Sequence, residues 1–385
     1  MKTRKKILFP IILFLGIYFF LEGSSWIFIK FYLVPKKKTR FIFKDKIEER
    51  IDRFASGNSK SKFDPVLGWK MKLQDEKNYE DWGYHIDKKG ARLNCKYEHK
   101  KTISTYGNSF TFCNQVSDDE TWQYYLSEMT KSNVINFGIG GYGTDQAFLR
   151  LKKEFKKNKT NIVILGILSE NLARNINRYR ALYMIGGWGP TKPMFFSKID
   201  GTYILLKNPI KKKEDLYKLN SDEFVNEICT DYDYWFPFYS SIPKFKFSFF
   251  FSLVKSVFIK NERHTYREIF NNDRAIETTK YIVRRFVEFS EQNKFHPVIV
   301  LFPTYLDLKN YYSNKTHSYE RLRDTLNNLE NLIIIDVLEV FRNKLALRTI
   351  KMEHLYIEKM HISPQGNFII AETIYRVLNE KKILN

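Results

Sequence analysis

Short apolar strands alternate with amphipathic helices along most of this chain, and that alternation constrains its fold more than any other feature. Strands are predicted at Thr102–Thr105, Val134–Phe137, Ile162–Ile167, Val298–Phe302 and Leu332–Ile335. Helices are predicted between them, near 118–130, 144–155, 275–292 and 319–329. The third strand is apolar throughout, which is typical of a parallel sheet covered on both faces. We therefore predict an α/β fold, a doubly wound three-layer α/β/α sandwich around a central parallel sheet of about five strands.

The segment between the third and fourth strands does not show this alternation of strands and helices. We predict an insertion there, at about 180–272, with a hairpin turn at Asp200-Gly201. Three regions follow for the whole chain: an N-terminal membrane anchor at 1–34, a juxtamembrane and covering segment at 35–98, and the main domain at 99–385.

Residues 7–29 form an apolar stretch, interrupted at 22–25, that is long enough to span a bilayer as one helix. A cleaved signal peptide is the alternative, because the first apolar run follows a basic start and has a suitable length. The second apolar run and the lack of a small-x-small cleavage site favour an uncleaved anchor. Basic residues flank both ends, so their balance does not set the orientation. We expect a single-pass membrane protein whose main domain is extracytoplasmic, in the periplasm.

The composition is basic, with 64 Lys and Arg against 43 Asp and Glu. This excess favours anionic partners, but lysines spread over a solvated surface explain it equally simply. The sequence has no zinc finger, RNA-binding motif or long basic arm, so we expect no nucleic-acid partner. Its cysteines, Cys95, Cys113 and Cys229, contain no CxxC pair and predict neither a disulfide framework nor a zinc site. We expect no metal and no cofactor.

Ser109 is the candidate nucleophile, because Gly107-Asn108-Ser109 directly follows the first predicted strand. A serine on a sharp turn at the carboxyl end of a strand can project toward loop amides that stabilise negative charge. His361 is the candidate base, since it lies just before a helix that begins with Ser363 as N-cap and Pro364 at the first position. The two residues are therefore expected at the same edge of the sheet.

Three motifs, taken in order, resemble those of the SGNH/GDSL hydrolase family, and most closely its membrane-anchored bacterial branch. They are residues 107–111, residues 136–146, and His361 with the Ser-Pro-x-Gly that follows it; 63–69 and 90–92 add to the resemblance. The resemblance implies a serine esterase that acts on ester bonds, with O-acyl or O-acetyl groups of a cell-surface glycan as the expected substrate. O-acyl transfer at the same site and a catalytically inactive protein that binds glycan or assembly partners are the alternatives.

The resemblance also implies the oxyanion donors: the backbone N–H groups of Ser109 and Gly141, and an Asn side chain after the third strand. We assign that side chain to Asn171, although matching without gaps places Glu170 there. A carboxylate cannot donate to an oxyanion. The family's Asp before the serine is Asn108 in this chain, and an amide can still brace the serine loop by hydrogen bonds.

The acid that orients the histidine also departs from the family pattern. The family has Asp two or three residues before the histidine, where this chain has Lys359 and Glu358. We assign this role to Glu358; a Ser–His dyad without an acid is the alternative. Arg174 and Arg180 follow the third strand and are candidate substrate-binding residues for an acidic or sugar ligand, or simply part of a solvated loop.

Overall fold

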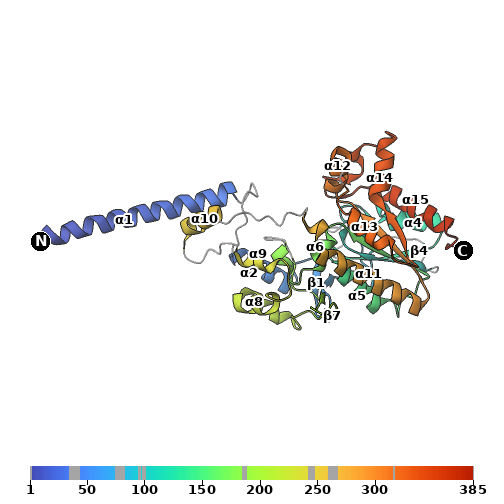
Figure 1. The fold of residues 1–385 in the computed structure, drawn as a ribbon, viewed down its shortest axis with the longest axis horizontal. Coiled ribbons are helices and arrows are strands. Elements are labelled where there is room, and N and C mark those ends of the chain that lie inside the picture. Colours follow the sequence, from blue (N-terminus) through green and yellow to red (C-terminus); the bar gives the residue numbers. More distant parts are fainter. Residues whose placement is uncertain are drawn as a thin grey trace.

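The structure is a computed structural model that describes residues 2–33, 44–73, 83–93, 97, 101–183, 189–241, 248–258, 268–314 and 317–384. Five parallel strands form its central sheet (Figure 1). In spatial order they are β4 (Asn133–Gly138), β3 (Lys101–Gly107), β5 (Ile162–Leu168), β8 (His296–Phe302) and β9 (Ile333–Asp336). The predicted fold class is confirmed. All seven residues of β5 are buried, as expected for a strand covered on both faces.

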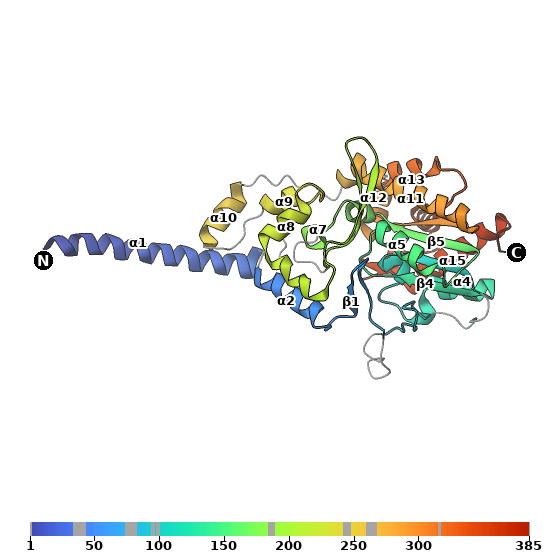
Figure 2. The same cartoon turned by 90° about the horizontal axis from the view of Figure 1, so that it is seen from below.

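Helices cover both faces of this sheet (Figure 2). One face packs against α5 (Thr144–Glu154) and α11 (Asp273–Asn293), and the other against α4 (Trp122–Thr130), α14 (Val337–Ala346) and α15 (Pro364–Glu380). The apolar residues of α11 recur every three or four positions, so one side of the helix is buried. Phe286 in that row is fully buried, and its removal from water contributes on the order of 1.5–3 kcal/mol.

The strand order places a topological switch point beside β3. From β3 the chain moves to β4 on one side, and then to β5 on the other side, before continuing to β8 and β9. In open α/β sheets, ligands bind outside the carboxyl ends of the strands where the winding direction reverses. The loops that follow β3, β4 and β5 therefore meet at the expected ligand-binding edge.

The region between β5 and β8 is an insertion with little regular sheet. It contains α6 (Asn171–Asn175), α7 (Arg180–Tyr183), β6 (Met194–Ser197), β7 (Tyr203–Leu206), the 3-10 helix η4 (Lys213–Asn220), α8 (Asp222–Cys229), α9 (Phe236–Ser241), α10 (Phe249–Phe258) and η5 (Glu268–Asn271). The antiparallel pairing of β6 with β7 confirms the hairpin predicted at Asp200-Gly201. Lys192 forms a buried ion pair with Asp145 of α5, which ties the insertion to the sheet domain.

An apolar helix is present at the N-terminus, as predicted, and projects away from the domain (Figures 1 and 2). It comprises α1 (Lys2–Ile27) and a π-helical continuation, η1 (Phe28–Leu33). Its segment Phe9–Tyr32 is long and apolar enough to cross a membrane, and a signal sequence has the same properties. Helix α10 packs beside α1, where the Glu22 carboxylate accepts a hydrogen bond of 2.7 Å from the Phe249 N–H.

The remaining elements connect these parts or cover their edges. They are α2 (Lys44–Ala55), β1 (Ser61–Asp64), β2 (Gly68–Met71), α3 (Ser109–Phe112), η3 (Asp118–Glu120), α12 (Tyr305–Asn314), α13 (Glu320–Asn327), η6 (Met352–His354), β10 (Tyr356–Ile357) and β11 (His361–Ile362). The predicted segment 35–98 is described only in part, since 34–43, 74–82, 94–96 and 98–100 lie outside the described residues. Cys95 is among the residues outside the description.

Candidate active site

Ser109 is the first residue of the short helix α3, directly beyond the carboxyl end of β3. Asn108 caps this helix, and its Oδ1 accepts a 2.8 Å hydrogen bond from the Phe110 N–H. The first N–H groups of a helix have no intrahelical partner, so the amide of Ser109 is suited to bind negative charge. Helix α3 also packs tightly on β4: a Cβ on Gly138 would lie 2.3 Å from the backbone nitrogen of Phe112. The glycine thus permits the serine helix to sit against the sheet.

The side chain of Asn171 is buried and supports the serine loop by hydrogen bonds. Its Oδ1 accepts hydrogen bonds of 2.7 Å from Asn108 Nδ2 and from the Leu168 N–H, and its Nδ2 donates to the Tyr142 carbonyl at 2.8 Å. The side chain therefore joins the loops that follow all three strands at the switch point. It does not line the cavity described below. In this geometry Asn171, the residue predicted as the third oxyanion donor, acts as a brace, whereas Glu170, which matching without gaps places at that position, lines the cavity.

Gly141 lies in the loop after β4, with a backbone φ of +84°. This left-handed conformation favours glycine, and a Cβ at this position would lie 3.2 Å from the guanidinium carbon of Arg180. Arg180 Nη1 donates to the Gly141 carbonyl at 2.6 Å, and Arg174 Nη1 donates to the Tyr142 carbonyl at 3.1 Å. Both arginines are largely buried. Their first role is therefore to hold the loop that presents the Gly141 amide.

A cavity of about 740 Å³ at this edge of the sheet brings together most of the predicted residues, but neither Asn171 nor Glu358. Its lining includes Ser109, Gly141, Glu170, Arg174, Arg180 and His361. Among the described residues that line it, the only carboxylate is Glu170, which pairs with Arg174 at 2.5 Å, whereas the cations also include Lys60 and Lys359. Burial, with a contribution from the nearby Arg174 charge, lowers the pKa of Arg180 to about 9. Arg180 thus remains cationic at neutral pH, and the cavity carries net positive charge.

His361 is held by a tight hairpin and by the helix that follows it. Strands β10 and β11 pair through a turn at Glu358 and Lys359, both with positive φ (47° and 59°), as in a type I′ turn. Ser363 then caps α15, accepting a 3.1 Å hydrogen bond from the Gly366 N–H, with Pro364 at the first helical position as predicted. These two constraints fix the backbone on either side of the histidine.

The imidazole of His361 has a partner that the sequence motifs did not indicate. Its Nδ1 lies 2.7 Å from Oε1 of Gln115, in the loop after the serine helix. Glu358, the residue predicted for this role, is exposed at the tip of the hairpin turn. A type I′ turn directs its central residues away from the strands, which explains why sequence proximity did not translate into contact. Gln115 lies outside the three motifs described above, so only the tertiary structure identifies it as the partner of His361.

Burial lowers the pKa of His361 to about 4, with the Arg174 charge acting in the same direction and Glu170 opposing it. The ring centroid lies 5.4 Å from that of Phe110, next to the nucleophile. Among the residues that the structure describes, no hydrogen bond joins Ser109 to His361. Such bonds are often long in free enzymes and shorten when substrate is bound. The neutral ring can act as a base over most of the pH range.

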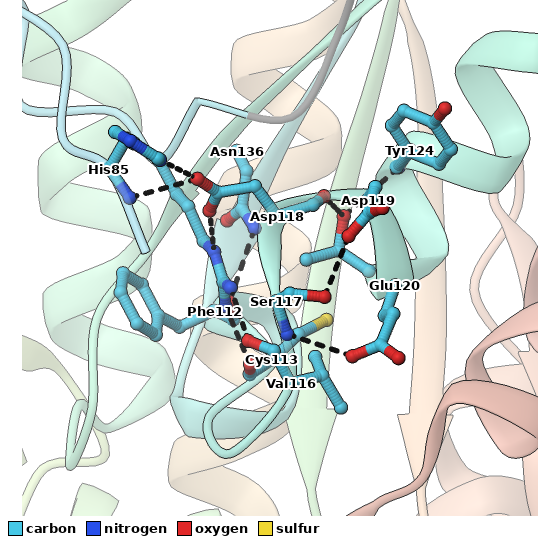
Figure 3. Close-up of polar contacts among 12 residues, drawn as sticks. His85, Phe112, Cys113, Val116, Ser117, Asp118, Asp119, Glu120, Tyr124 and Asn136 are labelled. Atoms are coloured by element: carbon cyan, nitrogen blue, oxygen red, sulfur yellow. Dashed lines mark hydrogen bonds and ion pairs between the residues drawn. The ribbon is translucent and has the colours of Figure 1, made fainter. Parts of the chain in front are cut away.

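Hydrogen bonds from the buried Arg92 side chain hold the loop that carries Gln115. Figure 3 shows the partners in this network, among them Phe112, Cys113, Val116 and Asp118. The Arg92 guanidinium donates to the carbonyls of Phe112, Cys113 and Val116 at 2.8, 2.6 and 2.6 Å. It also donates to Asp118 Oδ1 at 2.8 Å, while the other oxygen of Asp118 contacts the ring and the backbone N–H of His85. Arg92 therefore clamps the chain on both sides of Gln115.

Within the described ranges, no cluster of three or more His, Cys, Asp or Glu side chains is suited to hold a metal ion. Cys113 and Cys229 are buried free thiols, and burial raises the pKa of the Cys113 thiol to about 12. A thiol with so high a pKa is a poor nucleophile at neutral pH. Ser109 thus remains the candidate nucleophile of the cavity.

No family model matches this sequence, and no curated protein matches it either. Among solved structures, a protein described as lipolytic and of the G-D-S-L family from Desulfitobacterium hafniense is similar over 72% of this chain and 100% of that chain, at 13% identity and a TM-score of 0.38. A two-domain esterase active on acetylated mannans is similar over 84% and 57% of the two chains, at 11% identity and a TM-score of 0.39. An acetylxylan esterase from Geobacillus stearothermophilus is similar over 72% and 93%, at 14% identity and a TM-score of 0.35. These are distant likenesses to SGNH/GDSL esterases, and the site described above depends on the geometry of this chain alone.

Proposed function

We propose that this protein is a membrane-anchored serine esterase that removes O-acyl groups, most simply acetyl, from a cell-surface glycan. One observation carries the proposal: Ser109, His361 and the Gly141 loop surround one cavity at the switch point of the sheet. A nucleophile, a base and preformed amide donors are the parts that acyl transfer requires.

The reaction follows from these positions. Ser109 Oγ attacks the acyl carbon while His361 Nε2 takes the hydroxyl proton, and the N–H groups of Ser109 and Gly141 hold the oxyanion. The bond from the acyl carbon to the glycan oxygen then breaks, and His361 returns the proton to that oxygen. Water attacks the acyl-enzyme in the same manner, releasing the carboxylic acid and restoring Ser109.

We also propose that the substrate is negatively charged. Arg174 and Arg180 line the cavity together with Lys60 and Lys359, and such an excess of cations favours a ligand that bears carboxylates or phosphates. Because both arginines also hold the Gly141 loop, they would bind substrate mainly through charge. The proposed anchor is the apolar helix that includes residues 7–29, with the catalytic domain on the extracytoplasmic side.

Covalent labelling tests the proposal directly. The full chain in detergent is treated with a fluorophosphonate probe, and its hydrolysis of p-nitrophenyl acetate is measured. We expect labelling at Ser109 and turnover, both lost in Ser109→Ala, whereas Ser117→Ala, at an exposed serine eight residues along the chain, retains both. Absence of labelling in the wild type, or equal turnover in Ser109→Ala, would refute the esterase proposal.

Two other functions use the same cavity. O-acyl transfer differs only in the second step, where a sugar hydroxyl replaces water, and it predicts that an added glycan acceptor raises release of p-nitrophenol. Glu170 lines the cavity, whereas Asn171, the predicted amide donor, does not. This favours the third candidate, an inactive glycan-binding protein. That candidate predicts equal glycan binding by the wild type and Ser109→Ala, without labelling of either.

A further inference from the structure

We propose that Gln115 is the positioning residue of His361: its amide oxygen accepts the Nδ1 proton and so leaves Nε2 as the base. This inference rests on the proposed roles of Ser109 and His361. It assigns to a neutral amide from the serine loop the role that a carboxylate near the histidine was expected to fill.

The direction of approach supports this assignment. His361 lines the cavity, whereas Gln115 does not, so the 2.7 Å contact reaches Nδ1 from outside the cavity. The two imidazole nitrogens flank Cε1 and point in diverging directions, and the hydrogen bond made by one sets the protonation of the other. With Nδ1–H donated to Gln115, the lone pair of Nε2 is available to a proton on the cavity side.

The backbone of the loop gives a second, independent indication. Cys113 and Gln115 both have positive φ, at 62° and 72°, although neither is glycine. At Cys113 this conformation ends the serine helix, and at Gln115 a non-glycine residue keeps such a backbone only where the surroundings impose it. Arg92 imposes it here, through its hydrogen bonds to the Cys113 and Val116 carbonyls on either side.

An amide and a carboxylate at this position have different consequences. Both orient the ring, but only the carboxylate stabilises the imidazolium that forms when His361 takes the serine proton. The charges that act on the ring are those of Glu170, the N-cap of α6, and of Arg174 within α6, and they oppose each other. Exchanging Gln115 for Glu would therefore add an uncompensated negative charge directly at Nδ1.

The tautomer of His361 is the first test, and it does not require turnover. The full chain, labelled with ¹⁵N-histidine, is examined in detergent at pH 7, and the signals of His361 are identified by their loss in His361→Asn. We expect the chemical shifts of a ring protonated at Nδ1 in the wild type, and a mixture of tautomers in Gln115→Ala. A wild-type ring protonated at Nε2 would overturn the proposal.

The second test is the titration of the same ring. Gln115→Glu should move its midpoint upward by about one pH unit, because an opposite charge at this distance favours the imidazolium. Glu358→Gln is the matched control and should leave the midpoint unchanged. An unchanged midpoint in Gln115→Glu, or a lowered midpoint in Glu358→Gln, would overturn the proposal.

The acidic limb of kcat/KM for p-nitrophenyl acetate should follow the ring titration, with a three- to ten-fold loss of kcat in Gln115→Ala. A kcat in Gln115→Ala equal to that of the wild type would overturn the positioning role. If the wild type does not turn over, the esterase proposal fails, while the tautomer and titration still decide whether Gln115 orients the ring.

Discussion

Replacing Arg92 by Met tests whether the buried network holds the active-site loop. Arg92 is 2% exposed and donates four hydrogen bonds, to three carbonyls and to Asp118. At a net value of about 1 kcal/mol for each bond, the loss is about 4 kcal/mol. This agrees with the roughly 3–5 kcal/mol expected when one partner of a buried ion pair is removed.

The measurement is thermal unfolding of the full chain in detergent, followed by circular dichroism. At about 2 °C for each kcal/mol in a domain of this size, we expect Arg92→Met to lower Tm by about 8 °C. Arg376→Met is the control: this side chain is 66% exposed and lies 4.0 Å from Glu380, and such surface pairs contribute less than about 1 kcal/mol. The expected change in Tm for the control is therefore below about 2 °C.

Activity provides the second readout of the same variant. Because the loop carries the Gln115 that contacts His361, Arg92→Met should lower kcat even at temperatures where the domain is fully folded. If Arg92→Met melts within 2 °C of the wild type, the reasoning about the network is refuted. If it melts early but keeps a wild-type kcat when folded, the network stabilises the domain without positioning the base.

Three further predictions concern the cavity and its support. The acidic limb of kcat/KM should lie near pH 4, well below the ordinary histidine value of 6.5, because the ring loses its function as a base only when protonated; a limb near pH 6.5 would contradict the burial of His361. Gly141→Ala should reduce kcat at least ten-fold in steady-state assays, since the added Cβ is strained at φ +84° and meets Arg180; wild-type kcat would exclude this loop from catalysis. Lys192→Met should lower the free energy of unfolding in urea by about 3–5 kcal/mol, because it leaves the Asp145 carboxylate buried without its cation. The double variant Lys192→Met with Asp145→Asn should recover part of that loss, and no recovery would argue against the ion pair.

Local sequence patterns were sufficient for the strands and helices of the sheet domain, and for placing Ser109 and His361 beside one cavity. The apolar run at 162–167 and the serine turn after 102–105 are decided by neighbouring residues, because periodicity and turn chemistry act over a few positions. The cap of Ser363 on α15 is equally local, and it places His361 beside the same cavity as Ser109. For these features the sequence alone was a reliable guide.

The hydrogen-bond partners of the candidate site residues were decided by tertiary structure. Asn171 follows the third strand as expected, yet its amide is taken up by Asn108, Leu168 and Tyr142. Glu358 is near His361 in sequence, but the hairpin turn carries it into solvent, and Gln115, 246 positions away, makes the contact instead. A hydrogen bond requires a donor–acceptor distance correct to within tenths of an ångström and a suitable angle. Only the packing of the three loops around Arg92 and the switch point sets this geometry.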